Sequence, residues 1–461
     1  MATPVVTRTP AAAQARGGTA GLVGLRARAA GLADARHTAP GRLRLAGVLL
    51  AVLAVAFGGL TVWQVNSRAQ AADRVVSYSQ PLSQAAADIH RSLADADTTA
   101  ATGFLLAGAE PKAVRQRYES DLATASRLIS QAAARTTASS PAQAWLSSLN
   151  QQIPVYAGLV ETARADNRLG FPLGGAYLRY ASQQMRDTLL PDAVKLAAAE
   201  DAALARDYAE ARAVPWAAYG LGLVTLAALV QVQLVLFRRT NRVFNIGLAG
   251  ATLSVLAALV WLAGGSLLVQ NRLTESERDG SAPLRALNTA RVDVLTARLA
   301  ENLHLVARGS STMYADLWAS TTKELTGADG AGGGGALAQA QLLAPRDAAT
   351  AVGQAREQYA VWSERHAAAV TKETSDGDYQ AALDATITTK EADIPNTSDA
   401  SFAATDQKLE QAAQIEQARF RAAAVGTGGL LDTLAVGAGV LALVAAVSAV
   451  RGLGRRLAEY R

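Results

Sequence analysis

Four long apolar stretches divide the chain into membrane and extramembrane segments. They occupy residues 45–65, 214–237, 244–269 and 429–450, contain no lysine or arginine, and hold one acidic residue, Asp432. About 20 mostly apolar residues are enough to cross the hydrocarbon core of a bilayer as a helix. The pattern therefore predicts four transmembrane helices.

The two long segments between these stretches, 66–213 and 270–425, have a different periodicity. Apolar residues recur at steps of three and four, as in Leu82, Ala86, Ile89 and Leu93, which is the spacing of a helix packed in a bundle. Prolines at positions tolerated in a first helical turn help to set the boundaries. We expect helices over 66–108, 111–137, 141–168 and 174–213 in the first segment, and over 270–308, 311–326, 345–374 and 378–425 in the second.

The same order of features recurs in the two segments about 202 to 204 residues apart. Pro81-Leu82 corresponds to Pro283-Leu284, and Tyr156-Ala157 corresponds to Tyr359-Ala360. The common offset predicts an internal duplication. The expected fold is thus an all-α membrane protein with four transmembrane helices and two tandem extracytoplasmic four-helix bundles.

The arginines indicate which side of the membrane is cytoplasmic. Residues 1–44 carry seven arginines and one acid, residues 238–243 carry three arginines, and residues 451–461 carry four arginines and one acid. By the positive-inside rule these three segments are cytoplasmic, so both termini face the cytoplasm of a bacterial plasma membrane. The charge favours anionic lipids rather than nucleic acid as the neighbour of these arginines. We expect 1–44 to be disordered; the alternative, a signal peptide cleaved near Ala69–Ala71, requires an unusually long leader.

Composition excludes several kinds of chemistry. Half of the residues are apolar, the mean hydropathy is +0.12, there is no cysteine, and the four histidines lie far apart in the sequence. No nucleophile elbow, Walker lysine or H-E-x-x-H motif is present, and Gly327–Gly335 reads as a linker because no Gly-Lys-Ser/Thr follows it. We therefore expect no catalytic, cofactor or metal site and no enzymatic activity, with any cytoplasmic output delivered by another protein.

The candidate functional residues lie at helix turns and in the last span. Loop tips that expose apolar groups are common recognition sites, and Phe171 and Leu173 are expected at such a tip. The alternative is that these two side chains cap the end of the bundle core. In the last span, a charge and small residues can serve helix packing or an ion path. The candidates for partner contact are Glu110, Arg168, Phe171, Leu173, Asp376 and Asp378, and the intramembrane candidates are Asp432, Gly437 and Gly439.

The layout resembles two known groups of proteins. A span, a tall four-helix bundle and a second span resemble the sensory half of bacterial chemoreceptors, here without their HAMP domain and cytoplasmic coiled coil. Those receptors pair two bundles, so the resemblance implies a fused pseudo-dimer packed along the first helices. The Ala- and Arg-rich composition, the tandem layout and the turn Arg238–Asn245, followed by Gly247-Leu248, resemble the actinobacterial GlnX-type membrane proteins.

The second resemblance implies partners. GlnX-type proteins are encoded beside an extracytoplasmic amino-acid-binding lipoprotein and a soluble Ser/Thr kinase that controls glutamate metabolism. This resemblance implies a transmembrane sensor-relay that transmits a signal about external amino acids from the lipoprotein to the kinase. A non-signalling scaffold that organises the envelope is the alternative, followed by a transporter subunit.

The topology can be checked by thiol labelling, because the chain has no native cysteine. Single cysteines at Ser140 and Ser375 should react with a membrane-impermeant reagent in intact cells, and one at Thr240 should react only after lysis. Labelling of the Thr240 position in intact cells would contradict the arginine-based orientation.

Overall fold

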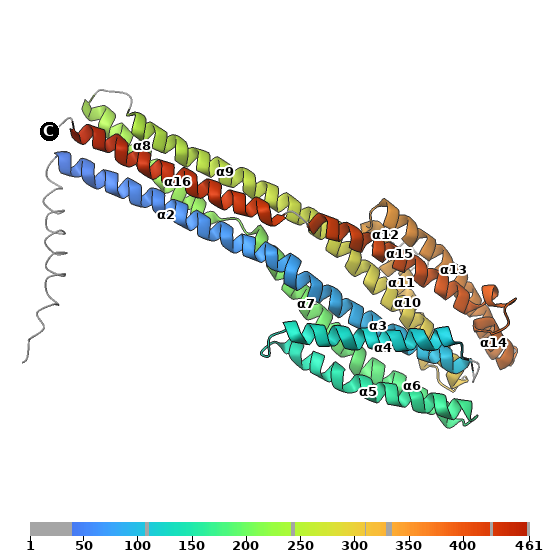
Figure 1. Cartoon of the computed structure of the whole chain (residues 1–461). Helices are drawn as coiled ribbons and strands as arrows, with labels where there is room; N and C mark the ends of the chain where they lie inside the picture. The colour runs from blue at the N-terminus through green and yellow to red at the C-terminus, as the bar shows by residue number, and fades with distance from the viewer. Residues whose placement is uncertain are drawn as a thin grey trace, which may run out of the picture. The chain divides into compact units, whose positions relative to one another are not determined.

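The computed structural model describes residues 39–106, 110–240, 245–308, 310–328, 334–424 and 427–458. Within these ranges the regular elements are all helices (Figure 1). Four helical stretches in this part of the chain are long and apolar enough to cross a membrane. The expected all-α membrane protein with four spanning helices is confirmed. Most of the segment 1–44 and parts of 238–243 and 451–461 lie outside the described residues.

One compact unit contains the membrane-spanning residues. Its core buries apolar side chains such as Leu50 and Phe57. Gln233 Nε2 donates hydrogen bonds to the Leu248 carbonyl at 2.9 Å and to Thr252 Oγ1 at 2.7 Å, which gives its amide partners where water is absent. The helices contributing to this unit are α2 (Ala39–Arg74), α8 (Trp216–Thr240), α9 (Ile246–Ser276) and α16 (Thr427–Ala458).

The second compact unit holds residues 67–213 and 267–430 and contains two apolar cores. The first core buries the periodic positions Leu82, Ala86, Ile89 and Leu93, as the sequence pattern predicts. We call the elements around it the first bundle: η2 (Val75–Ser79), α3 (Gln80–Leu105), α4 (Lys112–Arg135), α5 (Pro141–Arg168), α6 (Leu173–Gln184), η3 (Met185–Leu189) and α7 (Leu190–Arg212).

The second core buries Val294, Tyr359 and Trp362, and the Trp362 ring meets Tyr359 and Phe402 edge to face. We call the elements around it the second bundle: η4 (Glu277–Ser281), α10 (Ala282–Ala307), α11 (Met313–Thr326), α12 (Gly335–Leu343), α13 (Arg346–Thr374), α14 (Tyr379–Thr386), η5 (Ile394–Asn396) and α15 (Ser398–Ala424). The helices α3 and α10 have the same length and stand 202 residues apart in sequence.

Three single π-turns, η2, η3 and η4, have a common cause. Each is followed at its second residue by a proline, Pro81, Pro191 or Pro283. A proline inside a helix lacks the N–H for its hydrogen bond and its ring clashes with the carbonyl four residues earlier, and that carbonyl lies in the middle of each π-turn. The wider turn lets each helix continue past its proline, so α2 runs into α3 and α9 into α10 without leaving the helical conformation.

The expected single helix over 378–425 is wrong. The structure ends α14 at Thr386 and begins α15 at Ser398. The β-branched run Thr386–Thr389 has low helix propensity, and Pro395 lacks an N–H donor. The guanidinium of Arg365 holds the interruption in place, because its Nη1 donates to the Pro395 and Thr397 carbonyls at 2.9 and 2.8 Å. The helix α12 was also not expected from the sequence pattern.

The two bundles pack against each other along their first helices, α3 and α10 (Figure 1). Thr98 Oγ1 donates to the Leu295 carbonyl at 3.1 Å, and Asn302 Nδ2 donates to Thr102 Oγ1 at 2.9 Å. These buried contacts agree with the packing implied by the receptor resemblance. We call this interface the α3–α10 seam.

Cysteines at Thr102 and Asn302 should form a disulfide within one chain, because their present side chains touch across the α3–α10 seam. Oxidation followed by non-reducing electrophoresis after insertion of a protease site between the bundles would detect it. The pair at Thr102 and the exposed Ser147 of α5 serves as the control and should remain reduced. Failure of the first pair to crosslink in folded protein would contradict the seam.

Candidate functional site

The turn between α5 and α6 carries the apolar candidates. It is closed by a hydrogen bond from the Phe171 amide to the Asp166 carbonyl at 2.9 Å, and Gly170 has a φ of 75°, which favours glycine. Phe171 is 55 % exposed and Leu173 is 56 % exposed. Their side chains thus face solvent within this unit rather than capping the core. Arg168 at the end of α5 is exposed beside them.

The other predicted contact residues divide into two kinds. The carboxylate of Glu110 accepts a hydrogen bond from Arg164 Nη2 at 2.9 Å and is mostly shielded, so its contact is internal. Asp376 and Asp378 are exposed at the turn between α13 and α14, and Asp378 Oδ1 caps α14 by accepting from the Ala381 amide at 2.9 Å. The ends of α3 and α10 share a small apolar cluster with α14, and Asn167 Nδ2 near the end of α5 donates to the Phe104 carbonyl of α3 at 2.7 Å. The α5–α6 and α13–α14 turns therefore lie at the same end of the unit.

The intramembrane candidates all lie on α16. Gly437 approaches Trp261 of α9 so closely that an added methyl group would collide with the indole ring. A methyl group at Gly439 would press on Val62 of α2. Asp432 is exposed near the beginning of the helix. Small residues that allow such close helix contacts are typical of membrane interfaces.

The structure reveals a set of charges beside the α3–α10 seam that the sequence analysis did not single out. Asp95, Arg291 and Asp406 are buried, whereas Arg117 is partly exposed. Arg117 Nη2 of α4 lies 2.9 Å from Asp95 Oδ1 of α3 and 3.0 Å from Asp406 Oδ2 of α15, so it joins the two bundles. Arg291 of α10 adds a second cation 3.3 Å from Asp406 Oδ1. Burial raises the pKa of Asp95, and the Arg117 charge opposes that effect while the neighbouring Asp406 adds to it. Ion pairs with Arg117 and Arg291 therefore offset the cost of burying the Asp95 and Asp406 carboxylates.

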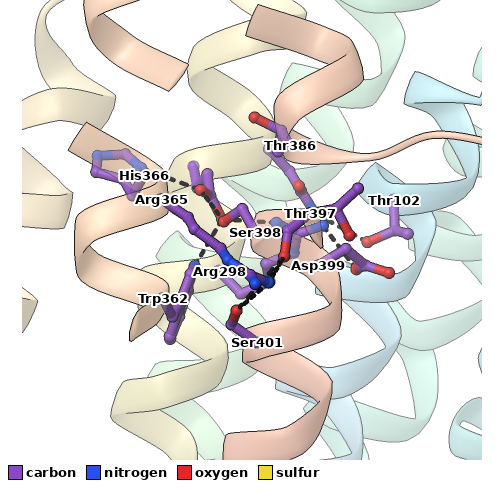
Figure 2. A network of polar contacts seen from close by, with 12 residues as sticks. Thr102, Arg298, Trp362, Arg365, His366, Thr386, Thr397, Ser398, Asp399 and Ser401 are labelled. Atoms are coloured by element: carbon purple, nitrogen blue, oxygen red, sulfur yellow. Dashed lines mark hydrogen bonds and ion pairs between the residues drawn. The ribbon is translucent and has the colours of Figure 1, made fainter. Parts of the chain in front are cut away.

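A second polar group surrounds the buried carboxylate of Glu301 on α10, and Figure 2 shows its partners converging from α13 and α15. Its Oε2 accepts from Arg298 Nη1 at 2.6 Å and from Trp362 Nε1 at 3.0 Å. Its Oε1 accepts from Ser398 Oγ at 2.5 Å and lies 3.1 Å from His366 Nδ1. Burial alone would raise the pKa of Glu301, but the Arg298 charge and the hydrogen bonds outweigh burial and lower it to about 2. The ionised carboxylate ties α10, α13 and α15 together.

A third group lies in the core of the first bundle around Asp97 of α3. Asp97 Oδ1 accepts from Tyr156 OH at 3.0 Å and from Ser182 Oγ at 2.8 Å. Among the described residues, Asp97 Oδ2 has no hydrogen-bond partner. Burial raises the pKa of Asp97 to about 6, because the lost hydration outweighs the hydrogen bonds from Ser182 and Tyr156 and the charge of Arg186. Asp97 therefore gains a proton under mildly acidic conditions.

Sequence reasoning could have found these groups by one signal. Charged residues interrupt the apolar stripes of α3 and α10 at helical spacing, as Asp97 does four residues after Leu93 and Arg298 does four residues after Val294. Such a residue must be buried if the stripe is buried. Which partners neutralise it depends on the distant helices that pack there, and those helices cannot be read from the stripe.

Comparison with known protein families finds a match for one segment of the chain. Residues 71–209, which include α3 to α6 and most of α7, match the family model of the actinobacterial sensor domain. The match supports a sensor-type actinobacterial protein and a sensing role, and it contains Asp95, Asp97 and Arg117 of the polar groups above. No curated protein and no solved structure matches the chain.

The substitution Asp97→Asn should stabilise the protein at neutral pH. The folded-state pKa is about 6, above the ordinary 3.8, so the native state loses stability as pH rises from about 4 to 6 and carries the full cost above that range. Asparagine keeps an acceptor for Tyr156 and Ser182 without the charge. Thermal unfolding at pH 8 should shift upward in the variant by several degrees and become less pH-dependent. Asp376→Asn, at an exposed position, should leave the unfolding curve unchanged.

The substitution Glu301→Gln should have the opposite effect. It leaves the buried Arg298 guanidinium with Asp399 as its remaining carboxylate partner, and breaking a buried ion pair costs about 3 to 5 kcal/mol. Chemical denaturation should show this loss above pH 4.5, where the wild-type carboxylate contributes fully, with the difference shrinking as pH falls toward 2. Glu364→Gln, on the exposed face of α13, is the matched control. An equal loss in both variants would contradict the role of the network.

Proposed function

We propose that the chain is a transmembrane sensor-relay that couples external amino-acid availability, received through an amino-acid-binding lipoprotein, to a cytoplasmic Ser/Thr kinase. The single observation that carries the proposal is the sensor-domain match over residues 71–209, whose first helix α3 continues from the spanning helix α2. Because such a domain is directly continuous with a spanning helix, a displacement of the domain can be transmitted along that helix into the membrane.

The α3–α10 seam is the proposed moving part. Both of its helices continue from spanning helices, α2 and α9, through π-turns. Packed interfaces switch between discrete arrangements, and shifts of about 1 to 2 Å between helices are a known form of switching. The cross-bundle contacts of Arg117 and Asn302 would have to rearrange in such a shift, which gives the two states distinct sets of partners.

The proposed input site is the end of the extramembrane unit that carries the α5–α6 turn. Phe171 and Leu173 are exposed apolar residues on a turn, with Arg168 beside them, and Asp376 and Asp378 give the other turn an acidic character. A lipoprotein would use the apolar group as an anchor and the charges for orientation. Glu110 supports this site from within through Arg164.

The proposed output is indirect, through a partner. The arginines of residues 1–44, 238–243 and 451–461 would hold these segments at anionic lipids on the cytoplasmic face of a bacterial plasma membrane. The kinase would read their position or spacing, and the chain itself would not be an enzyme.

Kinase-dependent phosphorylation, followed in cells when external amino acids are added, tests the relay. In cells that carry the double variant Phe171→Ser/Leu173→Ser, we expect the response to fall severalfold while membrane insertion and thermal stability remain normal. Val155→Ser, an equally exposed apolar position on α5, should respond like wild type. The Thr102→Cys/Asn302→Cys pair, once oxidised, should block the response, and reduction should restore it. A response that is the same with and without the chain would favour a scaffold.

A further inference from the structure

A pocket of about 440 Å³ lies between α3, α7 and α10. Its volume is in the range of small-molecule sites, about 300 to 1,000 Å³. The wall is largely apolar, and residues from the first and second bundles contribute to it together. The apolar lining residues include Ala87, Ala197, Ala198, Leu204, Leu284 and Val292.

Polar side chains without partners converge on this pocket. Among the described residues, the side chains of Gln84, His90, Arg285, Asn288 and Asp293 make no hydrogen bond or ion pair. These half-buried polar groups are therefore available to pair with groups of a bound molecule. The pocket thus has the arrangement of a ligand site, apolar walls with a few convergent polar groups.

The charges of the lining are unequal. Arg285 supplies one positive charge, while Asp201 and Asp293 supply two carboxylates. His90 adds no charge at neutral pH, because burial lowers its pKa to about 4. Asp201 is fixed to α3 by a hydrogen bond from Ser83 Oγ at 2.5 Å. A complementary ligand has one anionic and two cationic groups.

The spacing of Arg285 and Asp293 along α10 suits an elongated ligand. Arg285 and Asp293 are eight residues apart on α10, which is about 12 Å along the helix axis. Both side chains line the same pocket, and their own reach shortens the distance that the ligand has to cover. The apolar residues between them suit a chain of methylene groups.

We propose that this pocket binds a dibasic amino acid, with its carboxylate at Arg285 and its two ammonium groups at Asp201 and Asp293. An acidic amino acid would place a second carboxylate against the aspartates. An apolar amino acid would leave Asp293 without a partner, and a diamine would leave Arg285 without one. The dibasic amino acid alone among these four gives each charged lining residue an opposite charge.

The ionisation of Asp293 predicts how ligand binding depends on pH. Burial and the neighbouring Glu324 raise the pKa of Asp293 to about 7, so the empty pocket holds a partly protonated carboxyl. A side-chain ammonium favours the ionised form of Asp293 between pH 6 and 8. The other groups that face the site are Asp201, Arg285 and His90, of which His90 is neutral in this range. Binding of lysine should therefore tighten over this range and release protons.

Because the pocket joins α3 and α7 to α10, a ligand in it would favour one arrangement of the α3–α10 seam. This inference deepens the proposed sensor function and depends on it for its role in the cell. Binding to purified protein and signalling in cells are separate measurements. Binding without signalling would overturn the relay alone, and signalling without binding would overturn this site alone.

The test is calorimetric titration of the full chain in lipid nanodiscs with four matched probes. Lysine carries all three charges, norleucine lacks the terminal ammonium, cadaverine lacks the carboxylate, and glutamate replaces the distal cation with an anion. We expect norleucine and cadaverine to bind about tenfold more weakly than lysine, glutamate not to bind detectably, and lysine affinity to rise from pH 6 to 8. Equal affinity for all probes, tighter binding of glutamate, or no binding of lysine to folded protein would overturn the proposal.

Two variants assign the ends of the ligand. Asp293→Asn should lower lysine affinity to that of norleucine without changing norleucine, and Arg285→Gln should lower it to that of cadaverine without changing cadaverine. Asp192→Asn on α7, outside the pocket, should bind all probes like wild type. Thermal unfolding confirms that each variant is folded. If both variants weaken all probes equally, the contacts are not those proposed and the assignment fails.

Discussion

A charge placed inside a bundle of apolar helices must be neutralised, by an opposite charge or by a proton, because the interior does not replace the hydration it loses. Two buried carboxylates, Glu301 in the second bundle and Asp97 in the first, meet this requirement in different ways. Glu301 is surrounded by Arg298, Trp362, His366 and Ser398 and stays ionised. Asp97 has only neutral donors and a pKa of about 6. The Glu301 site is therefore held by ionic contacts, whereas Asp97 responds to mild acid.

The same constraint makes the α3–α10 seam specific. Arg117 lies between carboxylates from both bundles, Asp95 and Asp406, and separation of the bundles would leave these groups partly unpaired. Half-separated states are costly for that reason, and the seam is expected to occupy discrete arrangements rather than a continuum. Apolar contacts alone, such as Ala against Leu, would tolerate sliding far better.

The link from this seam to the spanning helices depends on a local accommodation of proline. Pro81 and Pro283 would normally end or kink a helix, yet the π-turns before them absorb the lost hydrogen bond and the steric clash. Both first helices of the bundles thus remain continuous with helices of the spanning unit. In the second bundle, Pro395 has no such π-turn, and there the helix is interrupted and held by Arg365.

Local pattern alone was enough to predict the helical class, the four spans and most helix boundaries. Twenty apolar residues in a row and a three-four periodicity dictate these features from within a segment, and Leu82, Ala86 and Ile89 are buried as that periodicity requires. The exposed turn with Phe171 and Leu173 could also be located, since a glycine-closed turn between two amphipathic helices is a local feature. The break at residues 387–397 was missed because the adjacent apolar periodicity outweighed the weak signal of a β-branched run.

The polar groups and the pocket were decided by tertiary structure. Glu301 meets Trp362 and Ser398, 61 and 97 residues away, and Arg117 meets Asp406 across 289 residues. Whether a carboxylate has a raised or a lowered pKa depends on which distant helix brings a cation to it, and no local pattern encodes that pairing. The sequence by itself determined which residues must be buried; only the packing of α3, α7, α10, α13 and α15 decided what each buried charge would face.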